Sequence, residues 1–471
     1  MFTGLLRSFL PIITMKHAWI YKNTVVIPYT VWQYFPGCFL YIKIPACAGG
    51  KIDRKKELHM DIKLYNKLKR NIVLDYINTF ITNLNMQSSV WVLYLAYCGL
   101  GMAETGIVEG IYHATSIIFE IPSGAIADLL GRKRSMVLGR VCIAVSCIIM
   151  LFSRSFWHFA LGFSIQALGN NFNSGSEEAL VYDSLKYIGK EHEYMRISGR
   201  RNVIIEVSQG IATVAGAVLA EYSYFWCYSA CLIIALLAAV QVLFITEAPV
   251  TGNMAGKNKT GNKPGWKDME IMETVRQHFK TSYDIIKSDI RILKIIVYYA
   301  VVFASQTLLF FYSQQYYKDL GYNKIQIGVI LLMAGICSCI GALFSSRLYN
   351  KYGRKIITAA SLLIAFAFVG YGFNNIILSV VLFMAAGFSD SLLYPVQSDE
   401  LNRLIPSGQR ATLVSVDSLF FSAAMIIMFP AAGALADIWG MDTVFSSIGI
   451  GLIVFVVVIL LLNRLLHKVE G

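Results

Sequence analysis

The sequence predicts an all-α, polytopic membrane protein with twelve transmembrane helices in two pseudo-symmetric six-helix bundles. Three observations lead to this fold. Hydrophobic residues make up 56% of the 471 positions and charged residues only 15%, whereas a soluble domain carries about 25% charged residues. Apolar runs of the roughly 20 residues that cross a bilayer recur along the chain. One long polar stretch divides these runs into two sets of six.

Each of the twelve expected spans is an apolar run between polar or basic residues. They lie at 72–98, 105–127, 134–153, 157–185, 202–221, 224–246, 293–316, 324–346, 356–374, 377–401, 411–436 and 443–463. The stretch between the two sets begins polar and glycine-rich and then shows apolar residues every three to four positions. This spacing is typical of a helix on the membrane surface. We therefore expect an N-terminal cytoplasmic extension at 1–70, a six-helix bundle at 71–246, a cytoplasmic linker with an amphipathic helix at 247–291, a second six-helix bundle at 292–465 and a cytoplasmic tail at 466–471.

Residues 24–48 are apolar and aromatic, but we do not expect a further span there. Pro28, Pro36 and Pro45 interrupt them, and proline breaks a regular helix. The stretch is also a poor signal peptide, because it lacks a clean apolar region followed by a small-residue cleavage site. A basic stretch that follows Met60 suits a cytoplasmic lead-in to the first span. We therefore expect residues 1–59 to be dispensable.

Positive charge indicates how the chain is oriented. The formal net charge is +12, but the basic residues lie in loops between apolar runs. That distribution follows the positive-inside rule and argues against a nucleic-acid partner. We therefore expect both termini and the central linker in the cytoplasm. The basic residues that follow the second and fourth spans are Arg132, Lys133, Arg134, Lys186, Lys190, Arg196, Arg200 and Arg201.

Two pairs of short patterns indicate an internal duplication. The triplet GRK begins at residue 131 and again at residue 353, an offset of 222. The patterns GAVLAE and GALAD begin at residues 216 and 433, an offset of 217, and close the fifth and eleventh spans. Two unrelated landmarks thus give nearly the same offset. Parallel repeats of this kind place a binding site at their interface.

The second span closes with a pattern of glycine and charged residues, and a degenerate copy follows the eighth span. The pattern and its copy are Gly124-x-x-x-Asp128-x-x-Gly131-Arg132-Lys133 and Gly353-Arg354. At this spacing the pattern resembles the signature loop between the second and third helices of the major facilitator superfamily. The resemblance covers about residues 70–465 and implies a twelve-helix secondary transporter that works by alternating access.

The resemblance also implies roles for individual residues. Asp128 is expected to interact with the N-terminus of the eleventh helix, and Arg132 to pair with Asp183 near the cytoplasmic end of the fourth. Gly124 lets two helices approach closely. Such a cluster is expected to lock the outward-facing state and to release during transport. Asn350 replaces the acid in the second copy, so we expect a weaker latch there.

Polar side chains inside the spans are candidates for a substrate or proton pathway, because such groups are costly in a bilayer and usually face a cavity. We expect at least one of Glu177 and Glu178 to be functional and to carry a proton, since their own span contains no Arg or Lys to pair with them. For the second span, a structural contact with other helices is an equally good interpretation. The candidates are Glu109, His113 and Glu120 in the second span, Asn170, Ser174, Glu177 and Glu178 in the fourth, and Asp390, Tyr394 and Gln397 in the tenth.

The charges expected inside the spans are nearly all acidic, which suits protons, cations or neutral substrates. Organophosphates would require paired intramembrane arginines, which the sequence does not indicate. No nucleophile–base pair, phosphate-binding loop or metal-ligand spacing supports an enzyme. We expect no cofactor and no metal.

These observations predict a secondary active transporter of a small organic molecule in the bacterial cytoplasmic (inner) membrane. Protons are the expected coupling ion, the lipid bilayer surrounds the protein, and a monomer is expected. Export is favoured over uptake only by analogy, because the helix-four arginine and the helix-five Gly-Pro motif of drug antiporters are missing. A proton-coupled uptake symporter for a nutrient or metabolite and a non-transporting membrane receptor stay open as alternatives.

Overall fold

The computed structural model describes residues 62–249, 287, 289–404 and 410–469. The first 59 residues and most of the expected surface helix of the linker therefore lie outside the described residues. The described part of the chain consists of α-helices, two short 3-10 turns and the connections between them.

The helices fall into two sets, one before and one after the central linker. The first set comprises α3 (Ile62–Thr82), a 3-10 turn (Met86–Ser89), α4 (Trp91–Tyr97), α5 (Met102–Leu130), α6 (Arg132–Phe152), α7 (Phe156–Asn173), α8 (Ser176–Tyr187), a 3-10 turn (Glu191–Glu193), α9 (Tyr194–Tyr222) and α10 (Tyr224–Leu243). The second set comprises α12 (Ile290–Asp319), α13 (Lys324–Tyr352), α14 (Lys355–Tyr371), α15 (Ile376–Leu404), α16 (Arg410–Trp439) and α17 (Met441–Val469).

Two glycines at equivalent places in the repeat make the turns that end α5 and α13. Gly131 has a φ of +94° and Gly353 a φ of +57°. This is the left-handed region of backbone conformation, which glycine enters without the penalty that a Cβ brings. The positive φ at these turns thus explains why each GRK triplet begins with glycine.

Two of the expected spans are not single helices. The span at 72–98 divides into α3 and α4, and α3 begins ten residues earlier, at Ile62. The span at 157–185 divides into α7 and α8 at Gly175, whose φ is +56°. Among the described residues, eight helices are long and apolar enough to cross a membrane by length and composition alone. The other expected spans are broken, shorter or richer in charge.

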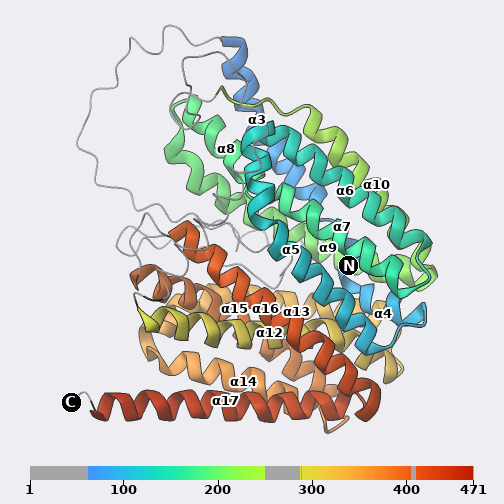
Figure 1. Cartoon of the computed structure of the whole chain (residues 1–471), viewed down its shortest axis with the longest axis vertical. Helices are drawn as coiled ribbons and strands as arrows, with labels where there is room; N and C mark the ends of the chain where they lie inside the picture. Colours follow the sequence, from blue (N-terminus) through green and yellow to red (C-terminus); the bar gives the residue numbers. More distant parts are fainter. Residues whose placement is uncertain (1–61, 250–286, 288, 405–409, 470–471) are drawn as a thin grey trace, which may run out of the picture.

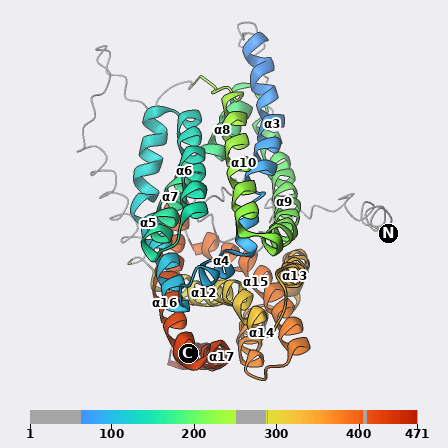
Figure 2. The same ribbon diagram turned by 90° about the vertical axis from the view of Figure 1, so that its right-hand side faces the viewer.

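The helices from α3 to α10 form one bundle and those from α12 to α17 form the other (Figure 1). The bundles touch most extensively along two helix pairs, α5 with α16 and α9 with α13, and α4 also packs against α12. In Figure 1 they meet at the end that carries α4 and separate toward the end that carries α8. We call these the convergent end and the divergent end. Figure 2, turned by 90°, shows α4 at the boundary between the bundles.

The buried core crosses the bundle boundary near the convergent end. Trp91 of α4 packs edge-on against Phe163 of α7 and Phe311 of α12, each at a ring-centroid distance of 5.3 Å. On the outside, large apolar side chains such as Leu236 of α10 and Val454 of α17 are exposed. An apolar outer surface is what a lipid environment favours.

Candidate functional site

The signature loop lies at the divergent end and is held by charged contacts within its own bundle. Arg132 Nη1 lies 2.7 Å from Asp183 Oδ2, and each side chain is about one third exposed. The N–H of Lys133 donates to Glu247 Oε1 at 2.7 Å, and its Nζ donates to the carbonyl of Leu243 at 2.7 Å. These contacts tie the start of α6 to α8 and to the end of α10.

The structure therefore contains the Arg132–Asp183 pair that the family resemblance implies. Gly124 is exposed, and nothing lies near the place of its missing Cβ. The side chain of Asp128 lies outside what the structure describes, so its contact with α16 stays a prediction. The proposed locking role of the cluster also stays a prediction.

The second copy of the loop carries an equivalent ion pair that the sequence did not indicate. Arg354 Nε lies 3.3 Å from Glu400 Oε1, and Arg354 follows Arg132 at the offset of 222. The side chain of Arg354 is 78% exposed, compared with 32% for Arg132. An exposed pair is screened by water and contributes little, so the copy should hold less firmly.

Glu177 has two cationic partners, both from other helices. The absence of Arg and Lys from its own span had led us to expect none. Arg140 of α6 forms an ion pair and hydrogen bond with Glu177 Oε1, and Arg201 of α9 places Nη2 3.6 Å from Glu177 Oε2. Arg201 Nε also lies 3.3 Å from Asp75 Oδ2 on α3. Glu178 lies close enough to Arg201 to interact with it electrostatically. We call Asp75, Arg140, Glu177 and Arg201 the buried charge network.

This network corrects two predictions from the sequence. Arg201 was assigned to a cytoplasmic loop, but α9 begins at Tyr194 and the arginine is only 8% exposed. Arg140, which is 3% exposed, was overlooked. The charges inside the spans are therefore not nearly all acidic. A lack of paired arginines inside the membrane therefore cannot be used to exclude anionic substrates. In this structure, however, both arginines are paired with carboxylates.

The acidic face of α5 points toward α16 of the other bundle. Glu109 and His113 are almost fully buried, with His113 Nε2 3.5 Å from Glu109 Oε1. The other ring nitrogen, Nδ1, lies 3.3 Å from Ser422 Oγ on α16. Glu120 is in hydrogen-bond contact with Ser415, which is also on α16. The three residues therefore lie at the interface between the two bundles.

The polar residues of the fourth span are partly committed to contacts with α5. Asn170 Nδ2 donates to the hydroxyl of Tyr112 at 2.8 Å, and Asn171 makes hydrogen bonds to Ser116. Ser174 lies at the end of α7, where the span is broken. These hydrogen bonds connect α7 to α5.

The tenth span carries a buried acid with an oxygen that accepts no hydrogen bond from the described residues. Asp390 on α15 is 8% exposed, and its Oδ1 has no hydrogen-bond partner within the described part of the chain. Gln397, two turns further on the same face, donates through Nε2 to Asp417 Oδ1 on α16 at 2.7 Å. Tyr394 packs against Phe303 of α12. Asp417 was not identified from the sequence.

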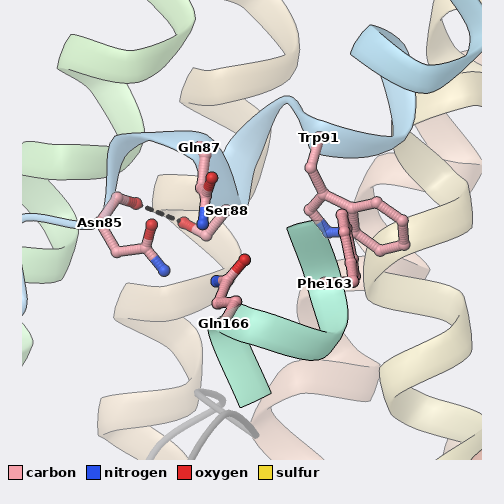
Figure 3. Close-up of a pocket in the computed structure, with 6 residues that line it drawn as sticks. All are labelled: Asn85, Gln87, Ser88, Trp91, Phe163 and Gln166. Atoms are coloured by element: carbon pink, nitrogen blue, oxygen red, sulfur yellow. Dashed lines mark hydrogen bonds between the residues drawn. The ribbon is translucent and has the colours of Figure 1, made fainter. Parts of the chain in front are cut away.

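The break between α3 and α4 brings neutral polar side chains together. Figure 3 shows amide and hydroxyl side chains that converge beside an aromatic pair, with Ser88 Oγ donating to the carbonyl of Asn85 at 2.8 Å. The cavity between them measures about 10 Å³, about the space of one water molecule. From the other bundle, Gln314 Nε2 on α12 donates to the backbone carbonyl of Ser88 at 3.1 Å. The lining residues are Asn85, Gln87, Ser88, Trp91, Phe163 and Gln166.

Two helical bundles with an apolar outer surface and buried polar groups at their boundary are typical of polytopic membrane transporters. The chain belongs to the Major Facilitator Superfamily, whose family model matches residues 76–369 and 295–470. The family and the all-helical polytopic membrane fold expected from the sequence are thereby confirmed.

The chain aligns with distant relatives over nearly the whole length of those proteins. The chain is 20% identical over 395 residues to the uncharacterized MFS-type transporter YxaM of Bacillus subtilis, with 81% of this chain and 92% of that protein covered. It is 21% identical over 411 residues to the quinolone resistance protein NorA of Staphylococcus aureus, with 83% and 97% covered. A crystal structure of the nucleoside transporter NupG superposes with a TM-score of 0.67 at 14% identity, covering 84% of this chain and 99% of that one. That similarity shows the shared fold.

Proposed function

We propose that the protein exports a small organic molecule in exchange for protons, by alternating access between its two bundles. The observation that carries the proposal is Asp390, a buried carboxyl group with an unpartnered oxygen among the described residues of the second bundle. A charged carboxylate in such a place is costly. Proton binding removes that cost, and exposure to water on one side of the membrane allows the proton to leave.

Asp390 is better suited to this task than Glu177. Arg140 and Arg201 both pair with Glu177, so its charged form is already stabilised. Asp390 shares a helix face with Gln397, which bonds to Asp417 of α16. Since α16 packs on α5 of the first bundle, a change of charge here is well placed to affect the bundle interface.

The orientation proposed from the loops fits the shape of the molecule. The divergent end carries the basic start of α6 and the Lys186 end of α8, so we place it in the cytoplasm by the positive-inside rule. In that orientation the end at which the bundles meet faces the outside, and the end at which they diverge faces the cytoplasm (Figure 1). An exporter takes up its cargo from the cytoplasm.

Export itself is supported by a relative. NorA is named for quinolone resistance, and the chain covers almost all of its length. Uptake of a nutrient by proton symport on the same fold is the second candidate, and only the direction of transport distinguishes the two.

The test uses purified protein in proteoliposomes with an imposed pH gradient and a panel of dyes, antibiotics and metabolites. We expect one or more compounds to accumulate against their gradient, driven by protons moving the opposite way. Asp390→Asn should abolish accumulation but leave exchange of substrate across the membrane. Asp399→Asn, the same change on an exposed acid of the same helix, is the control and should transport normally.

Four results would contradict the proposal. Accumulation driven by protons moving in the same direction would show a symporter. Normal accumulation by Asp390→Asn would show that this residue does not carry the proton, and loss of accumulation in Glu177→Gln alone would assign the task to helix four. No transport of any compound would favour a receptor.

A further inference from the structure

Two carboxylates bridge the bundles at the convergent end, one between α16 and α5 and one between α9 and α13. Asp437, near the end of α16, accepts hydrogen bonds from the backbone N–H groups of Met102 and Ala103, at 2.9 Å each. Glu221, near the end of α9, accepts one from the N–H of Lys324 at 2.8 Å. Met102 and Lys324 are the first residues of α5 and α13. Each carboxylate therefore sits on the N-terminus of a helix in the opposite bundle.

The two contacts are copies of each other under the internal repeat. The receiving helices begin at residues 102 and 324, which gives the offset of 222 already found for the GRK triplets. The acids at 221 and 437 are 216 residues apart, and they end the patterns GAVLAE and GALAD. The bridge is therefore a feature of the repeated unit and occurs on both sides of the molecule.

Glycines beside the carboxylates allow the close approach that these bonds need. Gly106, one turn into α5, lies so close to the carbonyl of Phe429 on α16 that a Cβ would collide with it. Gly328, one turn into α13, lies equally close to Ala217 on α9. These two glycines are again 222 residues apart. The tight packing and the carboxylate bridge thus occur together in both pairs.

The bonds are favourable for a physical reason that depends on the conformation. The first N–H groups of a helix lack partners inside it and carry partial positive charge, so a carboxylate there makes charge-assisted hydrogen bonds. These bonds join the two bundles and exist only while the convergent end is closed. At the divergent end, by contrast, the ion pairs Arg132–Asp183 and Arg354–Glu400 each stay within one bundle.

We propose that Glu221 and Asp437 are paired latches that hold the convergent end closed and so set the equilibrium between the two access states. They are positioning residues that act through the bundle interface. The proposal holds for export and for uptake alike, because it requires only that the bundles rock. Asp128 is expected to act on α16 at the opposite end, which would give the α5–α16 pair one latch at each end.

Distances between spin labels across the convergent end test the proposal. Tyr97 and Phe373 are 75% and 70% exposed at this end, one in each bundle, and cysteines there carry the labels in a background without native cysteines. We expect Asp437→Asn and Glu221→Gln each to raise the population of long distances about two- to fivefold in nanodiscs. The double variant should raise it further.

A matched control separates the latch from general weakening of α5. Glu104 also places a carboxylate at the start of α5, where it accepts the N–H of Gly101 at 3.1 Å, but it belongs to the same bundle. Glu104→Gln should therefore leave the distances unchanged. The proposal is overturned if the two latch variants, folded and monodisperse, keep the parent distances, or if Glu104→Gln shifts them equally. Because the latches are separate, either single variant suffices if the other fails to fold.

Discussion

Arg140 of α6 and Glu177 of α8 form a buried ion pair inside the first bundle. The arginine side chain is 4% exposed and the glutamate 17%. Arg201 extends the pair to Asp75, so charged groups from α3, α6, α8 and α9 meet in one place. The network fastens α8, the half of the broken fourth span that packs against α3 and α6, to its neighbours.

Removal of Arg140 should destabilise the protein strongly, because it leaves Glu177 buried with one partner fewer. We expect Arg140→Ala to cost about 3–5 kcal/mol of unfolding free energy, measured by thermal unfolding in detergent. Arg403→Ala, which breaks an exposed pair with Asp399, should cost about 1 kcal/mol or less. Arg140→Ala with Glu177→Ala should cost less than the sum of the single changes. Additive effects would argue against the pair.

Arg132→Ala should impair transport more than it impairs expression. The Arg132–Asp183 pair is one third exposed, so it contributes about 1 kcal/mol or less to stability. Because the pair lies within one bundle, its expected effect on the balance of states is indirect, through the position of the signature loop that carries Asp128. Cysteine labelling from both sides of the membrane would report it. Arg354→Ala, in the more exposed copy, should have the smaller effect. Unchanged labelling and unchanged transport for Arg132→Ala would refute the locking role.

A larger side chain at Gly106 should prevent the convergent end from closing. The carbonyl of Phe429 occupies the space that a Cβ would need, so Gly106→Val forces α5 away from α16. We expect correct membrane insertion with transport reduced to background. Gly335→Val, at a helical glycine with open space around it, should transport normally. Parent-like transport by Gly106→Val would mean that this close approach is not needed.

Deletion of residues 1–59 should leave insertion and transport intact. The expectation rests on the prolines at 28, 36 and 45 and on the basic lead-in after Met60; these residues lie outside the described structure. Membrane insertion measured by fluorescence of a C-terminal fusion, together with the transport assay, would decide it. Loss of folded, inserted protein would contradict it.

The sequence predicted the spans better than it predicted their partners. Apolar length and the repeated GRK triplets located both bundles because these signals are local. Arg140 was missed because its partner lies 37 residues away, and spacing does not reveal which helices meet. Arg201 was placed in a loop because the apolar run starts later than α9 does. Its inward direction depends on how that helix is rotated in the bundle.

The break in the first span has a signal in the sequence. Polar residues gather between Asn83 and Ser89 inside an otherwise apolar run, and irregular backbone at membrane depth is tolerated where protein buries it or where it lines a cavity. Asp417 had no such signal, because a lone acid near the end of a span resembles a loop charge. Its contact with Gln397 depends on how α15 and α16 pack.

The most direct test of proton-coupled transport is the proton flux itself. Proteoliposomes with an entrapped pH-sensitive dye would be loaded with a compound that the transport panel identifies and then diluted to create an outward substrate gradient. Antiport predicts that protons enter as substrate leaves, that Asp390→Asn abolishes this flux while substrate exchange continues, and that Asp399→Asn retains it. Substrate efflux from vesicles of the unaltered protein with no accompanying proton movement would contradict the account.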